Sequence, residues 1–345
     1  MKRILASSPH SQEAYALVEH LQTYFVKHLD ALSAKLGASK NFEPVEWFRC
    51  EGENGGGVRY VASDETLFNR ASVNVSQVQY ESDTTKGLAS ASAISTIIHP
   101  KNPYAPSMHM HISWTELKDG RGYWRMMADL NPSIVNETDT KRFSKALEVA
   151  SGDFFEEGSA QGDRYFKIPA LNRHRGVAHF YLENFNSGDF NSDMTLAKVL
   201  GEVVIETYTA IIDTAISTHI DIDKDALDKQ LAYHSVYLFQ VLTLDRGTTS
   251  GLLVHNQNDV GILGSIPSHV NRKLITSWID NMTPPQDALL KGILKALPKE
   301  DICYVDDVVK QNLANAVRTH YQQHKEALSL QAQGNTIPTT VNNHK

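Results

Sequence analysis

The stretch between residues 42 and 130 restricts the fold of this chain more than any other part of it. Five runs in it are rich in β-branched or aromatic residues: VEWFRC, GVRYVA, SVNVSQVQY, SAISTIIH and SMHMHISW. Clusters of Gly, Pro, Asn and Asp separate these runs, a pattern that is typical of β-strands joined by turns. Because several of the connections are short, we expect the strands to pair in an antiparallel manner.

Helical patterns stand on both sides of this strand-rich stretch. Apolar side chains recur at helical spacing in residues 12–36, and Gly37 follows as a typical helix end. On the same grounds we expect helices at residues 139–157, 193–219, 268–281, 284–297 and 304–331. Two apolar runs, 176–185 and 235–244, are expected to be further strands.

These elements predict one α+β domain over residues 1–331, with helices flanking both faces of a large antiparallel β-sheet. A length of 345 residues allows one large domain or two ordinary ones, but no linker or internal repeat divides this chain. Residues 332–345 are polar, and we expect them to form a disordered tail.

The charge, cysteine content and apolar segments of the chain limit the partners and the cellular compartment that we expect. The 33 basic and 40 acidic residues give a net charge of −7, without the long basic block that binds nucleic acid or an anionic membrane. Cys50 and Cys303 form neither a disulfide framework nor a metal-type spacing, which fits a reducing compartment. No apolar segment has the length of a signal peptide or a membrane span. We therefore expect a cytoplasmic protein without nucleic-acid partners or membrane insertion.

The run SMHMHISW places histidines at alternate positions. On a strand, His109, His111 and Ser113 share one face, whereas Ile112 lies on the other. One interpretation is that these are half-exposed strand histidines without a chemical role. A metal site that also includes His99 is a weaker alternative, so we expect no metal.

Charged residues at expected strand ends are a second set of candidates. Asp245 and Arg246 are expected to close the strand at 235–244 and to face a cleft, where the arginine can hold a substrate carboxylate. A turn with a solvated ion pair is the alternative interpretation. Asp129, in MMADLNP, is either a similar site residue or an ordinary turn residue.

Further positive charge precedes the run at 176–185, in Arg173 and Arg175. The glycine-rich segment EGENGGGVRYV is not a phosphate loop, because it lacks the GK[ST] ending and the helix that follows it. Taken together, the arginines, histidines and aspartates suit a polycarboxylate whose centre donates hydrogen bonds.

Several of these motifs occur in the order of a known family. Over about residues 40 to 275 the chain resembles the oxygen-dependent coproporphyrinogen III oxidases. The patterns HPxNPxxPxxH and DRGTxxG are specific, and both occur in order. The matching segments are WFRCEG (47–52), GGGVR (55–59), SVNVS (72–76), IIHPKNPYAPSMH (97–109), ADLNP (128–132), RGVAHF (175–180), DRGTTSG (245–251) and SIP (265–267).

The resemblance implies oxidative decarboxylation of two propionates of coproporphyrinogen III to vinyl groups, giving protoporphyrinogen IX with dioxygen as oxidant. It also implies a homodimer that needs no organic cofactor. By position, His109 resembles the family's proton donor, Ser95 its substrate-contacting serine and Arg246 its propionate-holding arginine. Asp129 and Asp245 resemble the aspartates at the pyrrole nitrogens. Because two aspartates near one centre repel each other, we expect a raised pKa for one of them.

The chain departs from the family where substrate contacts are expected. The family motif H-x-N-x-R reads HMHIS here, so its arginine is lost. A replacement is expected among Arg125, Arg173 and Arg175. We expect these further residues to contact substrate: His111, Ile112, Ser113, Arg175 and, in place of a family glycine pair, His255, Asn256 and Gln257.

A metal site of four histidines is credited to some bacterial members of the family. Here His99 and His109 match, but Ser144 and Ala170 occupy the other two positions. Two alternatives to a coproporphyrinogen III oxidase remain. The chain could be an enzyme acting on another tetrapyrrole or polycarboxylate, or a catalytically idle tetrapyrrole-binding protein. Retention of the four expected catalytic residues favours activity: His109, Asp129, Asp245 and Arg246.

Overall fold

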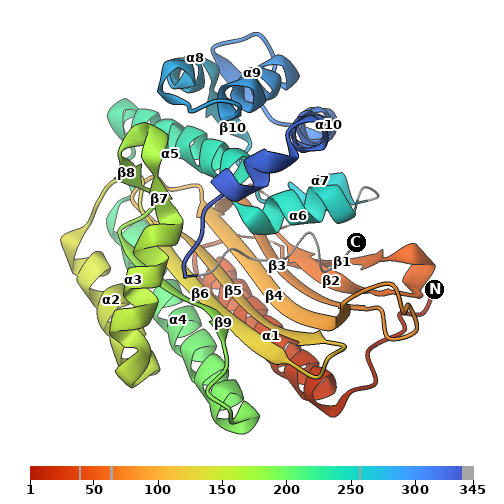
Figure 1. The fold of residues 1–345 in the computed structure, drawn as a ribbon. Helices are drawn as coiled ribbons and strands as arrows, with labels where there is room; N and C mark the ends of the chain where they lie inside the picture. The colour runs from red at the N-terminus through yellow and green to blue at the C-terminus, as the bar shows by residue number, and fades with distance from the viewer. Residues whose placement is uncertain (39, 63–64, 256–257, 336–345) are drawn as a thin grey trace.

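The structure of the protein is a computed structural model, which describes residues 1–38, 40–62, 65–255 and 258–335. Its main feature is a seven-stranded sheet with the strand order β1-β2-β3-β4-β5-β6-β9, in which all neighbours are antiparallel (Figure 1). All five runs expected as strands between residues 42 and 130 lie in this sheet. Its strands are β1 (Glu43–Phe48), β2 (Gly55–Val61), β3 (Phe68–Gln79), β4 (Leu88–Pro100), β5 (Ser107–Leu117), β6 (Gly122–Asn131) and β9 (Ala178–Phe185).

Helices flank both faces of the sheet, so the expected α+β architecture is confirmed. Among the described residues, no helix is both long enough and apolar enough to cross a membrane. The helices are α1 (Pro9–Lys35), α2 (Glu137–Ser151), α3 (Phe155–Phe166), α4 (Phe190–Thr218), α5 (Lys224–Thr243), α6 (Arg246–Val254), α7 (Asp259–Ile262), α8 (Arg272–Thr276), α9 (Gln286–Ala296) and α10 (Asp307–Gln323). Two two-stranded antiparallel sheets pair β7 (Lys167–Ile168) with β8 (Arg173–His174), and β10 (His269–Asn271) with β11 (Ile302–Tyr304).

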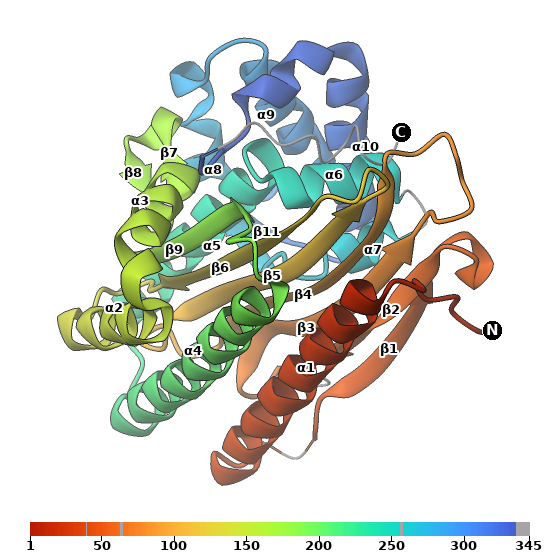
Figure 2. The ribbon, with the colours of Figure 1, turned by 60° about the horizontal axis from the view of Figure 1, so that its bottom comes forward.

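One face of the sheet is covered by the long helices α1 and α4 (Figure 2). Ser8 begins α1 by accepting a hydrogen bond from the backbone of Ser11, and Asp189 caps α4 in the same way. The buried side of both helices packs on apolar strand residues, among them Ile94 and Ile112. Gly201 of α4 leaves room for Leu21 and Ile112, because a Cβ at this glycine would lie 2.8 Å from a methyl group of Leu21.

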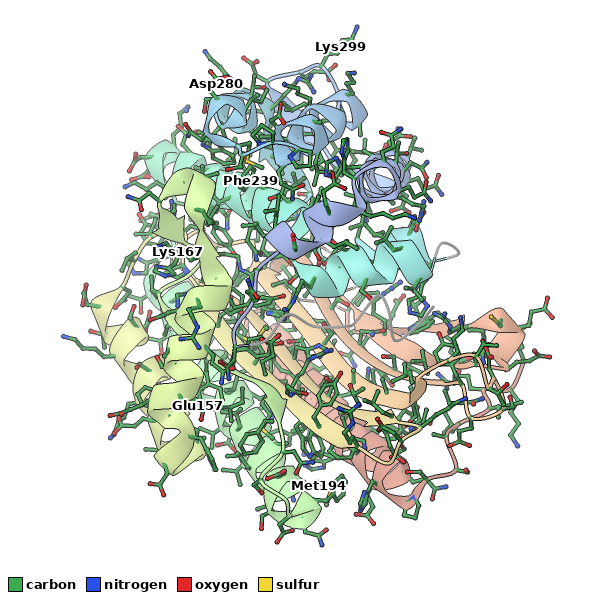
Figure 3. All side chains as sticks on the ribbon, in the orientation of Figure 1. Glu157, Lys167, Met194, Phe239, Asp280 and Lys299 are labelled. Carbon is green, nitrogen blue, oxygen red and sulfur yellow. The ribbon has the colours of Figure 1, made fainter. Side chains whose placement is uncertain are left out.

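The opposite face carries α5, α6 and α7, with α8, α9 and α10 stacked beyond them (Figures 1 and 2). A second apolar cluster holds these helices together. Phe239 of α5, which is labelled in Figure 3, lies in this cluster and is fully buried. Its ring centroid is 5.2 Å from that of Trp278. These helices cover only part of the sheet, and the polar face of the strands remains beneath α6 and α7 as the wall of a cavity.

The prediction of a strand at 235–244 is wrong, because these residues belong to α5. All residues from Tyr233 to Thr243 are buried, so every side of this part of the helix is covered, and the run shows neither helical nor strand periodicity. Asp245 and Arg246 consequently follow a helix, and Asp245 begins the next one.

The C-terminal part contains more than helices. The expected helix at 268–281 is shared between β10, α8 and a 3₁₀ turn, and β11 precedes α10. The expected tail at 332–345 is also wrong for its first residues. The backbone N–H of Ala332 donates to the carbonyl of Leu244 over 2.9 Å, and the N–H of Gly334 donates to Glu183 over 3.0 Å. Residues 336–345 lie outside the described part of the chain.

Candidate active site

A cavity of about 330 Å³ lies between the polar face of the sheet and the start of α6. Its floor follows one row of directly paired strand residues: Arg59 on β2, Asn74 on β3, Ser95 on β4, His111 on β5 and Met127 on β6. The side chains of this row face the same way because the strands pair in register. The volume is within the range of small-molecule sites in proteins.

His109 stands in the wall of this cavity and is oriented by a buried carboxylate. Its Nδ1 lies 3.0 Å from Oδ1 of Asp129, the residue directly opposite on β6. The His109 side chain is 17% exposed, whereas that of Asp129 is 0% exposed and does not line the cavity. Since Nδ1 is used by Asp129, only Nε2 of His109 remains for a ligand.

Asp129 is ionised by its surroundings. Burial alone would raise its pKa, but the charge of Arg175 and the hydrogen bonds from His109 and Asn131 lower the pKa from 3.8 to about 2. Arg175 Nη2 and Asn131 Nδ2 both donate to Oδ2, over 2.9 and 2.5 Å. We expected a raised pKa for either Asp129 or Asp245. For Asp129 this expectation is wrong, because its pKa is lowered.

Arg175 is held on several sides. It donates to Gln240 of α5 over 2.6 Å, and its guanidinium lies 4.7 Å from the ring centroid of Phe166. Burial would lower its pKa, but the charge of Asp129 outweighs burial and raises it. Arg175 lines the cavity, and its guanidinium is engaged by protein groups.

The other two arginines considered as replacements differ from each other. Arg125 lines the cavity and is directly opposite Ser113, where the family motif has lost its arginine. Arg173 is exposed and lines a separate groove beside Trp278, so it is not a site residue. The structure thus corrects the expectation for Arg173.

Asp245 and Arg246 enter the cavity from the start of α6. Asp245 accepts hydrogen bonds from the backbone N–H of Thr248 over 2.7 Å and from the hydroxyl of Tyr165 over 2.9 Å. Arg246 is paired with the buried carboxylate of Glu183, and its guanidinium lies 5.4 Å from the ring centroid of Tyr165. The DRGTTSG motif therefore contains cavity residues, although the run before it is a helix and not the expected strand.

The model of the family "Coproporphyrinogen III oxidase" matches residues 13–295, which is more than half of the chain. The chain belongs to the coproporphyrinogen III oxidase family. Curated relatives of this chain carry the name oxygen-dependent coproporphyrinogen-III oxidase. The relative from Rattus norvegicus is 28% identical, over 77% of this chain and 64% of its own length. The relative from Rickettsia akari is 25% identical, over 73% of this chain and 94% of its own length. A Drosophila melanogaster relative of that name is 26% identical over 73% of this chain and 69% of its own length. The chain thus spans a little under two thirds of the rat relative.

In this member of the coproporphyrinogen III oxidase family, the residues of the HMHIS motif (109–113) lie on two faces of the sheet. Ser95 and His111 line the cavity, and His111 Nε2 lies 2.9 Å from Oγ of Ser113, which is buried. Burial, together with the charges of His109 and Arg125, lowers the pKa of His111 to about 3. Ile112 is fully buried on the opposite face, so its expected substrate contact is wrong.

His255 also lines the cavity, where its ring contacts the guanidinium of Arg49. Asn256 and Gln257, the other two residues expected at this place, lie outside the described residues. The residue that follows α6 therefore lines the cavity, and its contact with substrate stays a prediction.

His99 does not join His109 at the cavity. It is fully buried under α5, with Nδ1 2.8 Å from Oγ of Ser107, and burial lowers its pKa well below 6.5. Within residues 1–38, 40–62, 65–255 and 258–335, no group of three or more His, Cys, Asp or Glu side chains could hold a metal ion. His99 packs against aromatic rings, with the centroid of Tyr237 at 4.5 Å.

Sequence reasoning missed two charged residues of the site. Arg59 was not among the expected site residues, although strand alternation places it on the same face as Gly57 and it is paired with Asn74. Glu183 gave no signal, because its role depends on Arg246 and on the backbone of Gly334, both distant in sequence.

Proposed function

We propose that the protein is an oxygen-dependent oxidative decarboxylase that converts two propionates of coproporphyrinogen III to vinyl groups and yields protoporphyrinogen IX. The observation that carries this proposal is the His109–Asp129 pair at a cavity whose walls bear arginines and one further aspartate. The names of the curated relatives support the same reaction for members of this family.

Asp245 is the proposed partner of the pyrrole nitrogens. A porphyrinogen has saturated bridges, so it can pucker and direct its N–H groups toward one acceptor. Thr248 and Tyr165 already hold the Asp245 carboxylate, which fixes its orientation before substrate arrives. Asp129 is completely buried behind His109, so we assign it a positioning role and not a contact with the ring.

His109 is the proposed proton-transfer residue. Its free Nε2 can exchange a proton with the substrate, while the Asp129 carboxylate fixes the ring and stabilises the imidazolium. Arg246 and Arg125 are the proposed holders of propionates, and Ser95 and His111 the proposed contacts along the cavity floor. Neutral His111 adds no charge near Arg125, because its pKa is lowered to about 3.

The reaction balances with dioxygen as the only oxidant. Each protonated propionate loses carbon dioxide and two hydrogens, the new carbon–carbon double bond forms between the α and β carbons, and dioxygen takes up two electrons and two protons. Hydrogen peroxide is the product that closes this balance. A homodimer and a cytoplasmic location are further parts of the proposal, supported by the family resemblance and by the cysteine content.

The test is aerobic incubation of purified protein with coproporphyrinogen III, followed by mass spectrometry of the porphyrin products. We expect loss of two carboxyl groups per macrocycle. Binding without turnover would favour an idle tetrapyrrole-binding protein. Neither binding nor turnover would favour an enzyme for another tetrapyrrole or polycarboxylate, and would contradict the proposal.

A further inference from the structure

Arg59 lines the cavity on β2, three strands away from His109 on β5. It projects from β2 and is half-buried, in register with Asn74 of β3. Burial lowers the pKa of its guanidinium, and the charge of Asp307 opposes this effect only in part. Arg59 is therefore a cation that has lost much of its hydration.

Arg59 has no hydrogen bond and no ion pair with any of the described residues. Arg175 and Arg246, in the same cavity, are paired with Asp129 and Glu183. A desolvated cation without a partner costs free energy, so a buried charge normally has a counter-charge. Among these three arginines, only Arg59 forms no ion pair with a described residue, and the charge of Asp307 offsets its desolvation only in part.

The surroundings of Arg59 are shaped to admit its guanidinium. A Cβ on Gly261 of α7 would lie 2.4 Å from Nη1 of Arg59, so the glycine leaves the space that the guanidinium fills. Beside it, the indole of Trp47 donates to Oδ1 of Asn74 over 3.0 Å. The guanidinium of Arg59 thus occupies a place in the cavity wall between β2 and α7.

We propose that Arg59 binds a peripheral carboxylate of the substrate at the β2 end of the cavity. This inference rests on the proposed function and adds a second anchoring point to it. From β2 to β6 the sheet makes four strand spacings, so Arg59 and Arg125 lie about 19 Å apart at the backbone. A ligand that engages both must carry carboxylates on opposite edges, as a tetrapyrrole with four propionates does.

The experiment compares ligand affinity and stability in Arg59→Gln. The probe is coproporphyrin III, the aromatic and fluorescent form of the macrocycle, titrated in parallel with its neutral tetra-amide. We expect the Kd for coproporphyrin III to rise by about 10-fold or more, because a hydrogen-bonded charge pair is lost. The Kd for the tetra-amide should be the same for the variant and for the unaltered protein.

The melting temperature of the ligand-free protein supplies an independent readout. Arg59→Gln removes a desolvated charge that has no ion-pair partner among the described residues, so the melting temperature should stay the same or rise. A structural role would instead lower it. Arg59→Lys keeps the charge but not the planar fork and should give an intermediate Kd. Arg173→Gln, an exposed arginine outside the cavity, is the matched control and should leave both Kd and melting temperature unchanged.

The outcomes separate this inference from the proposed function. If the unaltered protein does not bind coproporphyrin III, the proposed function and the inference fail together. If it binds, but Arg59→Gln binds equally tightly or loses the same affinity for the tetra-amide, only the inference fails. A lower melting temperature of ligand-free Arg59→Gln would also overturn it, because Arg59 would then stabilise the fold.

Discussion

The two faces of the sheet share one backbone and carry opposite chemistry. Toward α1 and α4, strands β4, β5 and β6 present residues such as Ile94, Ile112 and Ala128, all fully buried. Toward α5 and α6 the intervening positions present His109 and Asp129, with arginines at the cavity walls. One face gains free energy from burying apolar area, whereas the other must satisfy every polar group or leave it for a ligand.

The polar face itself shows both solutions. At its β6 end, Asp129 is satisfied by Arg175, His109 and Asn131. At its β2 end, Arg59 has no such partner among the described residues. This difference teaches that the groups around Asp129 hold one another in a fixed geometry, whereas Arg59 is placed to bind an anionic group of a ligand. The following experiments would break or sharpen this contrast.

The largest effect is expected from Asp129→Asn. Loss of the charge that orients His109 should lower kcat by about 100-fold or more, with a smaller change in KM, because Asp129 does not touch the cavity. Steady-state kinetics measure both constants. Asp119→Asn, at an exposed aspartate, is the control, and an unchanged kcat in Asp129→Asn would refute the positioning role.

Next in size is the contrast between Ile112→Ala and His111→Ala, which alter adjacent residues on opposite faces. Ile112→Ala should reduce the free energy of unfolding by about 2–5 kcal/mol through the cavity it leaves, with KM unchanged. His111→Ala should raise KM with a smaller loss of stability. Chemical denaturation and kinetics test this pair. Equal effects on KM would show that the two faces do not act separately.

A smaller effect concerns acid stability. The pKa of Asp129 is lowered in the folded protein from 3.8 to about 2, so its ionised form stabilises the fold above pH 3.8. This contribution, about 2 kcal/mol, should disappear as the pH falls through 3.8 to about 2. Urea unfolding at several pH values measures it. In Asp129→Asn the corresponding pH dependence should be missing, and its persistence would assign the effect to other carboxyls.

The smallest effect is expected at Arg125. Arg125→Gln should raise KM by about tenfold, because one charge-assisted contact to a propionate is lost, while kcat stays similar. Arg173→Gln, two residues from Arg175 in sequence but outside the cavity, should leave KM within about twofold. An equal rise in both variants would point to overall charge and not to a specific contact.

Sequence reasoning could predict features that depend on neighbours along the chain. Strand alternation correctly put His109 and His111 on one face and Ile112 on the other, and only the family motif placed Ile112 among substrate contacts. The specific motif at Asp245 led to the cavity even though the preceding run was misassigned. That run is buried on all sides, so periodicity carried no information there.

The amino-acid sequence by itself determined the α+β class, the strand-rich centre and the family, because short-range periodicity and ordered motifs are written along the chain. The tertiary structure alone decided which charged groups meet. It buried Asp129 behind His109, turned Arg173 outward and Arg175 inward, and left Arg59 without a partner among the described residues. The physical reason is that pairing and desolvation depend on segments brought together by folding, and no local pattern records which segments those are.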